Sequence, residues 1–71
     1  MKLQLNGSLV DLSESASAGA FTISALLALH KIRPETVVVE HNRIVPPKSS
    51  YDSIKLRDGD QIEIVKFMGG G

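Results

Sequence analysis

An α+β fold, with one main helix packed on one face of a four- to five-stranded mixed sheet, is predicted by three features of the sequence. A hairpin signal lies near the N-terminus, a single amphipathic helix follows it, and strand-like apolar segments occupy the second half. The 71 residues make one small domain, in which one helix and one sheet must bury each other's apolar faces.

The N-terminal segment predicts a β-hairpin. Leu3 and Leu5 alternate with polar neighbours, as in a strand with one buried face. Asn6-Gly7 follows, and both central positions of a type I′ turn need a positive φ, which these residues tolerate best. A second strand over residues 8–12 is therefore expected to run back antiparallel to the first.

One helix is expected after a surface loop. Residues 13–20 are small and polar without a period, which indicates the loop, and Thr22 is a good N-cap. A helix face recurs at the i, i+3, i+4, i+7 spacing, formed by Ile23, Leu26, Leu27 and His30. The helix is expected to end near Arg33, because Pro34 disfavours helical geometry in the residue before it.

The second half predicts further strands. The three valines at 37–39 suit a strand covered on both sides, and residues 44–47 predict a short edge strand stopped by its two prolines. A turn is expected at residues 58–59, and residues 61–67 alternate again. The connection between the last two strands carries apolar anchors, Tyr51, Ile54 and Leu56.

This order of elements constrains the topology. With the first strand central and the last strand parallel beside it, the helix covers one sheet face and the other face stays open, as in the ubiquitin-like β-grasp. The core then consists of Leu3, Leu5, Leu26, Leu27, Val37, Val39, Ile62 and Ile64. Alternation places Val65 and Phe67 on the open face, where they form a candidate docking patch.

Charge and cysteine content narrow the classes of function. Eight basic residues balance eight acidic ones, so nothing indicates a nucleic acid or an acidic membrane as the partner. Without cysteine, the side chains cannot carry a disulfide, a thiolate metal site or a persulfide, which fits a reducing compartment. The N-terminus lacks a signal h-region and no apolar run reaches membrane-span length, so a cytoplasmic location is expected.

Three glycines, Gly69, Gly70 and Gly71, follow the last predicted strand. Glycine lacks a Cβ, so such a segment is thin and can present an unhindered carboxylate within a narrow channel. The same glycines also fit a frayed end or an expression scar. The apolar strand directly before them favours the reactive end, because a scar normally follows a polar end.

Several stretches carry a family resemblance. Val-Val-Val-Glu-His-Asn at 37–42, Ile-Val-Pro at 44–46 and Asp-Gly-Asp at 58–60 precede a strand that leads into the glycines. In this combination nearly the whole chain resembles the ThiS family of thiamine-biosynthesis sulfur carriers. It departs from the family pattern in the loop at 13–20, which is longer than expected, and at Pro47, where arginine is common.

The resemblance implies a carrier and not an enzyme. A ThiF-like adenylating enzyme would use ATP to convert the Gly71 carboxylate to an acyl-adenylate. A persulfide on a sulfur donor would then displace AMP and leave a thiocarboxylate. A ThiG-like thiazole synthase would accept that sulfur for the thiazole ring of thiamine. All ATP chemistry would belong to the partner, so no bound cofactor is expected on this chain.

The chain is thus expected to comprise a β-grasp domain, residues 1–66, and a flexible tail, residues 67–71. Fully extended, the tail would reach roughly 17 Å from the domain. Partners are expected to contact the root of the tail, at Val65, Lys66, Phe67 and Met68. His30 and His41 lack acidic or thiol companions at ligand spacing, so no metal site is predicted.

Three other functions share this sequence pattern. A molybdopterin-type sulfur carrier would use the same tail chemistry toward a different acceptor. A ubiquitin-like protein modifier would be conjugated to lysines through its terminal carboxylate. A β-grasp binding module would not use its glycines at all.

Overall fold

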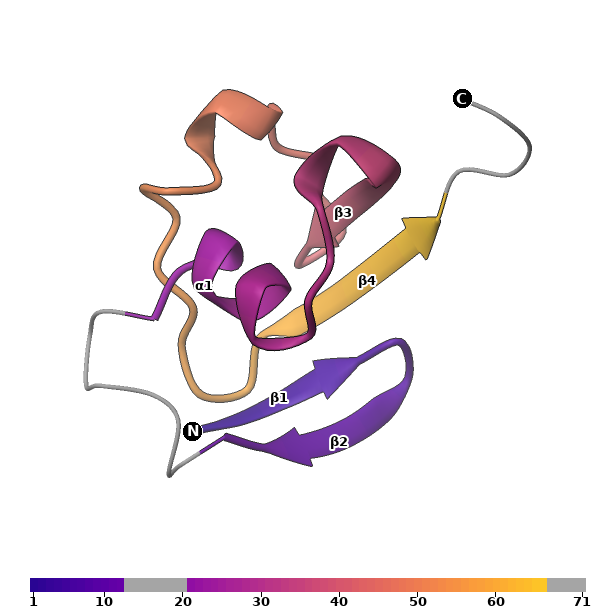
Figure 1. Cartoon of the computed structure of the whole chain (residues 1–71). Coiled ribbons are helices and arrows are strands. Elements are labelled where there is room, and N and C mark those ends of the chain that lie inside the picture. The colour runs from indigo at the N-terminus through magenta and orange to yellow at the C-terminus, as the bar shows by residue number, and fades with distance from the viewer. Residues whose placement is uncertain (13–20, 67–71) are drawn as a thin grey trace.

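One mixed sheet and one α-helix make up the part of the chain that the structure describes (Figure 1). The computed structural model describes residues 1–12 and 21–66. The elements in chain order are β1 (Lys2–Leu5), β2 (Ser8–Asp11), α1 (Ile23–Leu29), the 3₁₀ turn η1 (Pro34–Thr36), β3 (Val37–His41), the 3₁₀ turn η2 (Lys48–Ser50) and β4 (Gln61–Lys66). The sheet has the order β2-β1-β4-β3, with β1 and β4 parallel and the other pairs antiparallel. The predicted topology is confirmed.

The β1–β2 hairpin forms at the predicted turn. Asn6 and Gly7 have φ values of 50° and 82°, as a type I′ turn requires. The Asn6 amide donates to the Ile62 carbonyl at 2.9 Å, and Asn6 Oδ1 accepts from the Ile64 amide at 2.7 Å. The turn therefore also extends the contact between β1 and β4.

Helix α1 begins at its predicted cap. Thr22 is extended, and its Oγ1 accepts a hydrogen bond from the Ala25 amide at 3.1 Å. The buried helix face consists of Ile23, Leu26 and Leu27. His30, which was expected to continue this face, is exposed because the helix has already ended there.

The expected helix end near Arg33 was wrong, because a Schellman motif stops α1 earlier. Lys31 adopts a left-handed φ of 57°, and its amide donates to the Ala28 carbonyl at 3.0 Å. The Ile32 amide donates to the Leu27 carbonyl at 2.8 Å. These two bonds satisfy terminal carbonyls of the helix and turn the chain away before the proline is reached.

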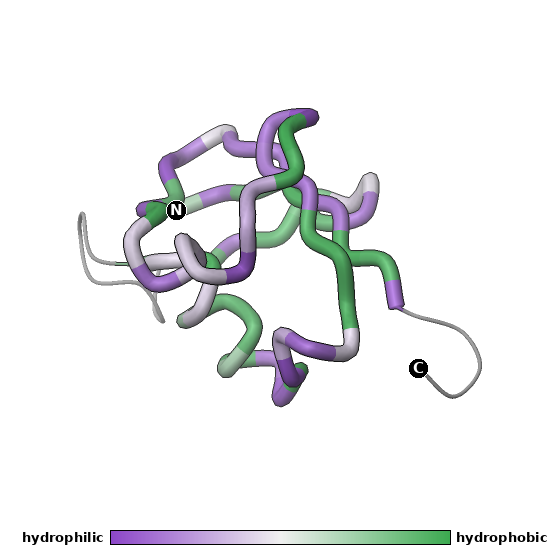
Figure 2. Tube along the Cα trace, turned by 90° about the horizontal axis from the view of Figure 1, so that it is seen from above, coloured by the Kyte–Doolittle hydropathy of each residue, from purple (hydrophilic) through white to green (hydrophobic). Residues whose placement is uncertain are grey.

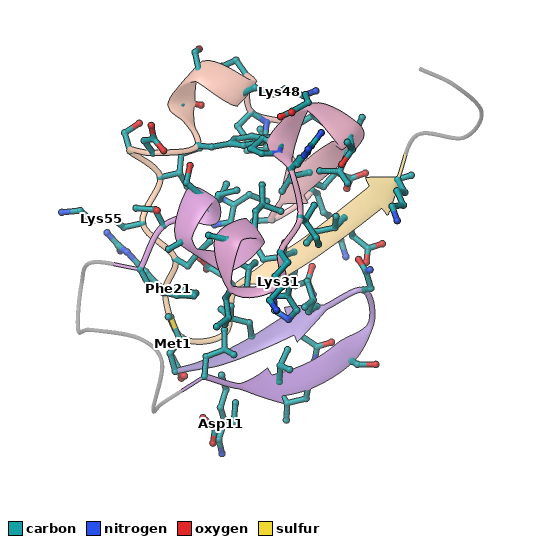
Figure 3. The ribbon with its side chains drawn as sticks, in the orientation of Figure 1. Met1, Asp11, Phe21, Lys31, Lys48 and Lys55 are labelled. Carbon is teal, nitrogen blue, oxygen red and sulfur yellow. The ribbon has the colours of Figure 1, made fainter. Side chains whose placement is uncertain are left out.

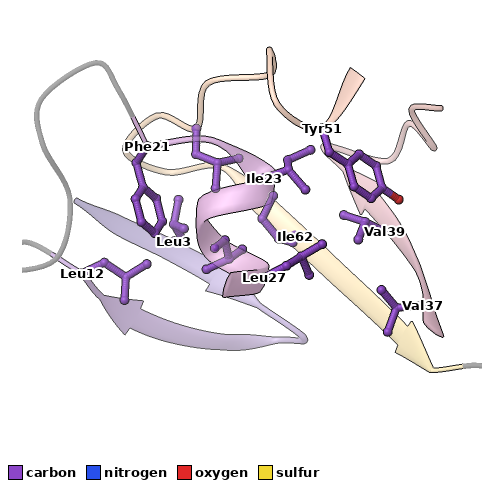
Figure 4. Packing of buried hydrophobic residues seen from close by; sticks show 11 residues of the cluster. Leu3, Leu12, Phe21, Ile23, Leu27, Val37, Val39, Tyr51 and Ile62 are labelled. Atoms are coloured by element: carbon purple, nitrogen blue, oxygen red, sulfur yellow. The ribbon is translucent and has the colours of Figure 1, made fainter. Parts of the chain in front are cut away.

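The core fills the space between α1 and one face of the sheet (Figure 4). Its buried members are Leu3, Leu12, Phe21, Ile23, Leu26, Leu27, Val37, Val39, Tyr51, Leu56 and Ile62. Leu5 and Ile64, which were predicted as core, are only partly buried at its edge. Leu12 and Phe21 were not predicted, and Figure 3 shows Phe21 near Met1 at the end where β1 starts. The anchors predicted in the last connection are confirmed by Tyr51 and Leu56.

Two strand predictions need correction. Residues 44–47 form no strand: Ile44 makes a single bridge to His41, and the prolines that follow have no amide to extend it. The valines at 37–39 are not covered on both sides, because β3 lies at the sheet edge and α1 covers one face. Val37 and Val39 are buried, whereas Val38 is only half-buried.

The sheet face turned away from α1 is open within the described residues. Successive side chains of a strand point to opposite faces, so every second residue lies on this face. Polar and apolar residues alternate accordingly along β1 and over residues 61–64 of β4 (Figure 2). The members of the open face are Lys2, Gln4, Leu9, Asp11, Val38, Glu40, Gln61, Glu63 and Val65. All of them are exposed except Val38 and Glu40, which are half-buried.

The turn after β3 predicts a stabilising substitution. Asn42 and Arg43 have φ values of 52° and 70°, and arginine adopts this region at a cost that glycine avoids. Arg43→Gly should raise the free energy of unfolding by about 0.5–1 kcal/mol in urea denaturation.

The matched control reverses the change in the other turn. An added Cβ at Gly7 meets no atom within 4 Å, so Gly7→Arg should cost only backbone strain, about 1 kcal/mol. A loss of stability in Arg43→Gly would show that its side chain contributes more than its backbone costs.

Candidate functional site

The sequence places the functional site beyond the C-terminal end of β4, which the structure describes as far as Lys66. The β3–β4 ladder runs to this point, with Val38 opposite Val65 and Val37 opposite Lys66. The β1–β4 ladder stops earlier, at Leu5 opposite Ile62. The last residues of β4 thus have a backbone ladder on one side only, and β4 leads out at the rim of the sheet (Figure 1).

Asn6 supports β4 on the side that β1 leaves. Its Oδ1 accepts from the Ile64 amide at 2.7 Å, which replaces the next ladder bond with a side-chain bond. The sequence predicts Asn6 as a turn residue and does not predict this role. An asparagine directly after a central strand, next to a longer parallel strand, is a pattern that indicates such a side-chain bond to the neighbouring backbone.

The two sides of the β4 terminus differ in character. Val65 lies on the open face and is 58% exposed. Lys66 is exposed at the end of β4 on the face toward α1, where it lines a groove of about 280 Å³. The groove is lined by Leu5, Asn6, His30, Ile32, Val37, Ile64 and Lys66. Its lining combines four apolar side chains with the polar side chains of Asn6, His30 and Lys66.

The predicted site residues divide between the described and the undescribed parts of the chain. Val65 and Lys66 are described, and both are exposed at the rim as expected for partner contacts. Phe67, Met68 and the glycines at 69–71 lie outside the described residues, as does the loop at 13–20. The flexible tail and the modified carboxylate therefore stay predictions.

The Asp-Gly-Asp turn before β4 ties the start of β4 to the start of its neighbour β1. Asp58 Oδ1 accepts from the Lys2 amide at 2.7 Å, and the Gly59 amide donates to the Lys2 carbonyl at 2.7 Å. Gly59 has a φ of 88°, which glycine adopts without strain. The motif thus fixes where β4 begins relative to β1, and through β4 where the tail leaves the domain.

Asp60 has more hydrogen-bond partners than Asp58, the other carboxylate of this turn. Its Oδ2 lies 2.8 Å from His41 Nε2 and accepts from the Arg57 amide at 2.9 Å, while Oδ1 accepts from Asn42 Nδ2 at 3.2 Å. Burial by itself would raise the pKa of Asp60. The hydrogen bonds with His41, the Arg57 amide and Asn42 outweigh burial and hold that pKa below its ordinary value.

The histidines have structural roles. His41 belongs to the Asp60 network, and His30 Nδ1 lies 3.1 Å from the Leu26 carbonyl at the end of α1. Within residues 1–12 and 21–66, no three His, Cys, Asp or Glu side chains gather as a metal site. In the same residues, no helix is long and apolar enough to cross a membrane.

Comparison with known proteins identifies the family. The sequence profile of the ThiS family matches residues 3–71. The chain belongs to the ThiS family. The sulfur carrier protein ThiS of Bacillus subtilis is 42% identical over 69 residues, which cover 97% of this chain and 98% of that protein. This match over both lengths confirms the resemblance to the ThiS family.

A solved ThiS structure confirms the fold. The crystal structure of the thiamine biosynthesis protein ThiS from Geobacter metallireducens superposes with a TM-score of 0.80 at 33% identity and covers all of both chains. The predicted ubiquitin-like β-grasp, a mixed sheet with one main helix, is thereby established.

ThiS-like sequence also occurs within larger proteins. The thiazole synthases of Paramagnetospirillum magneticum and Magnetococcus marinus are 42% and 41% identical to this chain over 71 residues. The chain spans only about one fifth (20%) of the length of each.

The Asp60 network predicts pH-dependent stability. Because the pKa of Asp60 is depressed in the folded state, the stabilisation is complete above the unfolded-state pKa and is lost as the pH falls through the folded-state pKa. Asp60→Asn should lower the free energy of unfolding by about 2 kcal/mol at neutral pH, since charge-assisted hydrogen bonds are lost.

Urea denaturation of both proteins from neutral to strongly acidic pH measures this difference. The gap between wild type and Asp60→Asn should shrink as Asp60 becomes protonated in both folded and unfolded chains. A gap that stays constant with pH would show that the carboxylate charge contributes nothing.

Proposed function

We propose that this chain is a sulfur carrier of thiamine biosynthesis and that its working group is the carboxylate of Gly71. The full-length match to the Bacillus subtilis sulfur carrier is the observation that carries this proposal. The structure supports it because β4 ends at the sheet rim shortly before the glycines in sequence, with Val65 and Lys66 exposed there.

The proposed chemistry activates a poor electrophile. A carboxylate oxygen of Gly71 attacks the α-phosphorus of ATP on a ThiF-like adenylating enzyme, which releases pyrophosphate and leaves an acyl-adenylate. The outer sulfur of a donor persulfide then attacks the acyl carbon and AMP departs. Cleavage of the acyl disulfide by a second thiol leaves the thiocarboxylate and a mixed disulfide on the donor.

The composition of the chain agrees with this division of labour. The chain has no cysteine, so covalent sulfur can be carried only on the terminal acyl group. The domain holds the tail, and the partner enzymes supply the nucleotide and the persulfide. No ATP site on this chain is needed for the proposed cycle.

A ThiG-like thiazole synthase is proposed as the acceptor of the sulfur. Two proteins named thiazole synthase each contain a stretch more than 40% identical to this whole chain. Joining two domains in one polypeptide raises their effective concentration for each other, which favours pairs that act in succession. A molybdopterin-type carrier would require a different acceptor, and a protein modifier would form isopeptide bonds to lysines.

Intact-mass analysis tests the proposed function. After incubation with a ThiF-like enzyme, ATP and a persulfide donor, the chain should gain the mass difference between sulfur and oxygen. Deletion of Gly70 and Gly71 should abolish the gain and leave the thermal midpoint nearly unchanged, because glycine has no side chain to bury. A mass increase corresponding to a conjugated protein would instead indicate a modifier, and a large loss of stability would contradict the proposed free tail.

Phe67 tests the expected docking patch separately. Phe67→Ala should raise the KM of adenylation for the carrier several-fold without unfolding the domain, because a buried aromatic contact with the partner is lost. Leu9→Ala is the matched control, since Leu9 is 67% exposed on β2, away from the β4 terminus. Equal kinetics for the two variants would remove Phe67 from the interface.

A further inference from the structure

We infer that Glu40, Glu63, Val38 and Val65 form one docking surface, the acidic patch, which receives arginine or lysine side chains from the adenylating enzyme. The inference rests on the proposed function, since it concerns how that enzyme recognises the carrier. It adds residues of β3 to the site, whereas the sequence predicts partner contacts only at and after the end of β4.

The first observation is a pair of like charges. Glu40 lies directly opposite Glu63 in the antiparallel β3–β4 ladder, on the face turned away from α1. Like charges directly opposite one another on a sheet are destabilising. The ion pairs within the described residues, Met1 with Asp11 and His41 with Asp60, involve neither glutamate. The folded domain therefore holds two adjacent carboxylates that a partner's cations could neutralise.

The second observation is the apolar pair beside these charges. Val38 lies opposite Val65, two residues closer to the tail along both strands. Val65 is 58% exposed, and Val38 is half-buried. The described residues place no helix over this face, because α1 lies on the other side (Figure 4). An apolar pair next to two charges on an open sheet face has the composition of a docking surface, with an apolar contact and a charged border.

The third observation is space next to the charges. A hollow of about 180 Å³ lies beside Glu63 where β1 turns away from β4. It is lined by Gln4, Gly7, Gln61, Ile62 and Glu63. Gly7 contributes no side chain to fill it, so an arginine or lysine from a partner can lie there and reach the Glu63 carboxylate.

The charge of the patch identifies its partner by complementarity. An enzyme that brings a carboxylate onto the α-phosphorus of ATP must surround the triphosphate with cationic groups. The acidic patch begins at Val65, one residue before the end of β4, so an enzyme that takes the predicted tail into its site also faces the patch. Arginine or lysine side chains around the entrance to such a site would pair with Glu40 and Glu63 and orient the carrier with the tail inward. Lys66 does not neutralise the patch, because it lies at the α1 side.

Adenylation kinetics with a purified ThiF-like enzyme and ATP test this inference. Glu40→Gln combined with Glu63→Gln should lower kcat/KM for the carrier roughly two- to tenfold at low salt, mainly through KM. High salt should remove the difference, because it screens the wild-type attraction. The thermal midpoint should stay unchanged or rise, since a like-charge repulsion is removed.

Asp11→Asn supplies the matched control. Asp11 lies on the same open face but at the opposite end of the sheet, opposite Lys2, so the variant makes one unit of the same charge change away from the tail. Each single glutamate variant should exceed it in effect, and Glu63→Lys should exceed Glu63→Gln.

The outcomes separate the inference from the proposed function. If wild type is adenylated and the double variant has the same KM as Asp11→Asn at low salt, the acidic patch is not a docking surface. If wild type itself is not adenylated at Gly71, the proposed function fails, and with it the inference. A higher KM together with a lowered thermal midpoint in the double variant would assign the glutamates a structural role and would also contradict the proposed docking surface.

Discussion

The parallel pairing of β1 with β4 is the contact on which the rest of this structure depends. It joins the first strand of the chain to the last one through the Gln4 amide to the Asp60 carbonyl and the Asn6 amide to the Ile62 carbonyl, both at 2.9 Å. The Asp58-Gly59 turn fixes its start, and the Asn6 side chain continues it past the hairpin. Only when this pairing exists do α1, β3 and the long connection share one core, because Leu3 and Ile62 lie at its centre. Such a contact closes nearly the whole chain into a loop, so its entropy cost must be met by burial of that core.

Local chemistry explains which parts of the fold were predictable from sequence. The Asn6-Gly7 turn, the Thr22 cap and the alternation of the strands depend on near neighbours, and each formed as predicted. The end of α1 was missed because Lys31 adopts a conformation that glycine usually supplies, and the energy for this comes from the Schellman bonds and from burial of neighbouring residues. The burial of Leu12 and Phe21 was missed because they flank a polar segment whose sequence carries no period.

In the candidate site, too, some residues can be predicted from their own strand, whereas others are placed only by pairing with a strand distant in sequence. Val65 and Lys66 follow from the alternation of one strand, so sequence alone predicted their exposure. Glu40 and Val38 become part of the site only through the register between β3 and β4, which no single segment encodes. The residue types also mattered, because an aspartate that caps a turn and a glutamate on an open face look equally polar in sequence. Their hydrogen bonds distinguish them: Asp60 has several, and they lower its pKa, whereas Glu40 and Glu63 face each other.

The central position of β4 has a mechanical consequence. A pull on its C-terminal end acts along the strand. β3 holds β4 over residues 62–66 and β1 holds its first residues, through hydrogen bonds perpendicular or oblique to that pull. These bonds are loaded together in shear, so they must break together, whereas a strand at a sheet edge can be peeled away one bond at a time. An enzyme that binds the segment beyond Lys66 can therefore apply a pulling force to it and move the whole domain without unfolding the sheet. The domain therefore resists force best along the axis of β4, which is the direction of a pull on the segment that follows this strand.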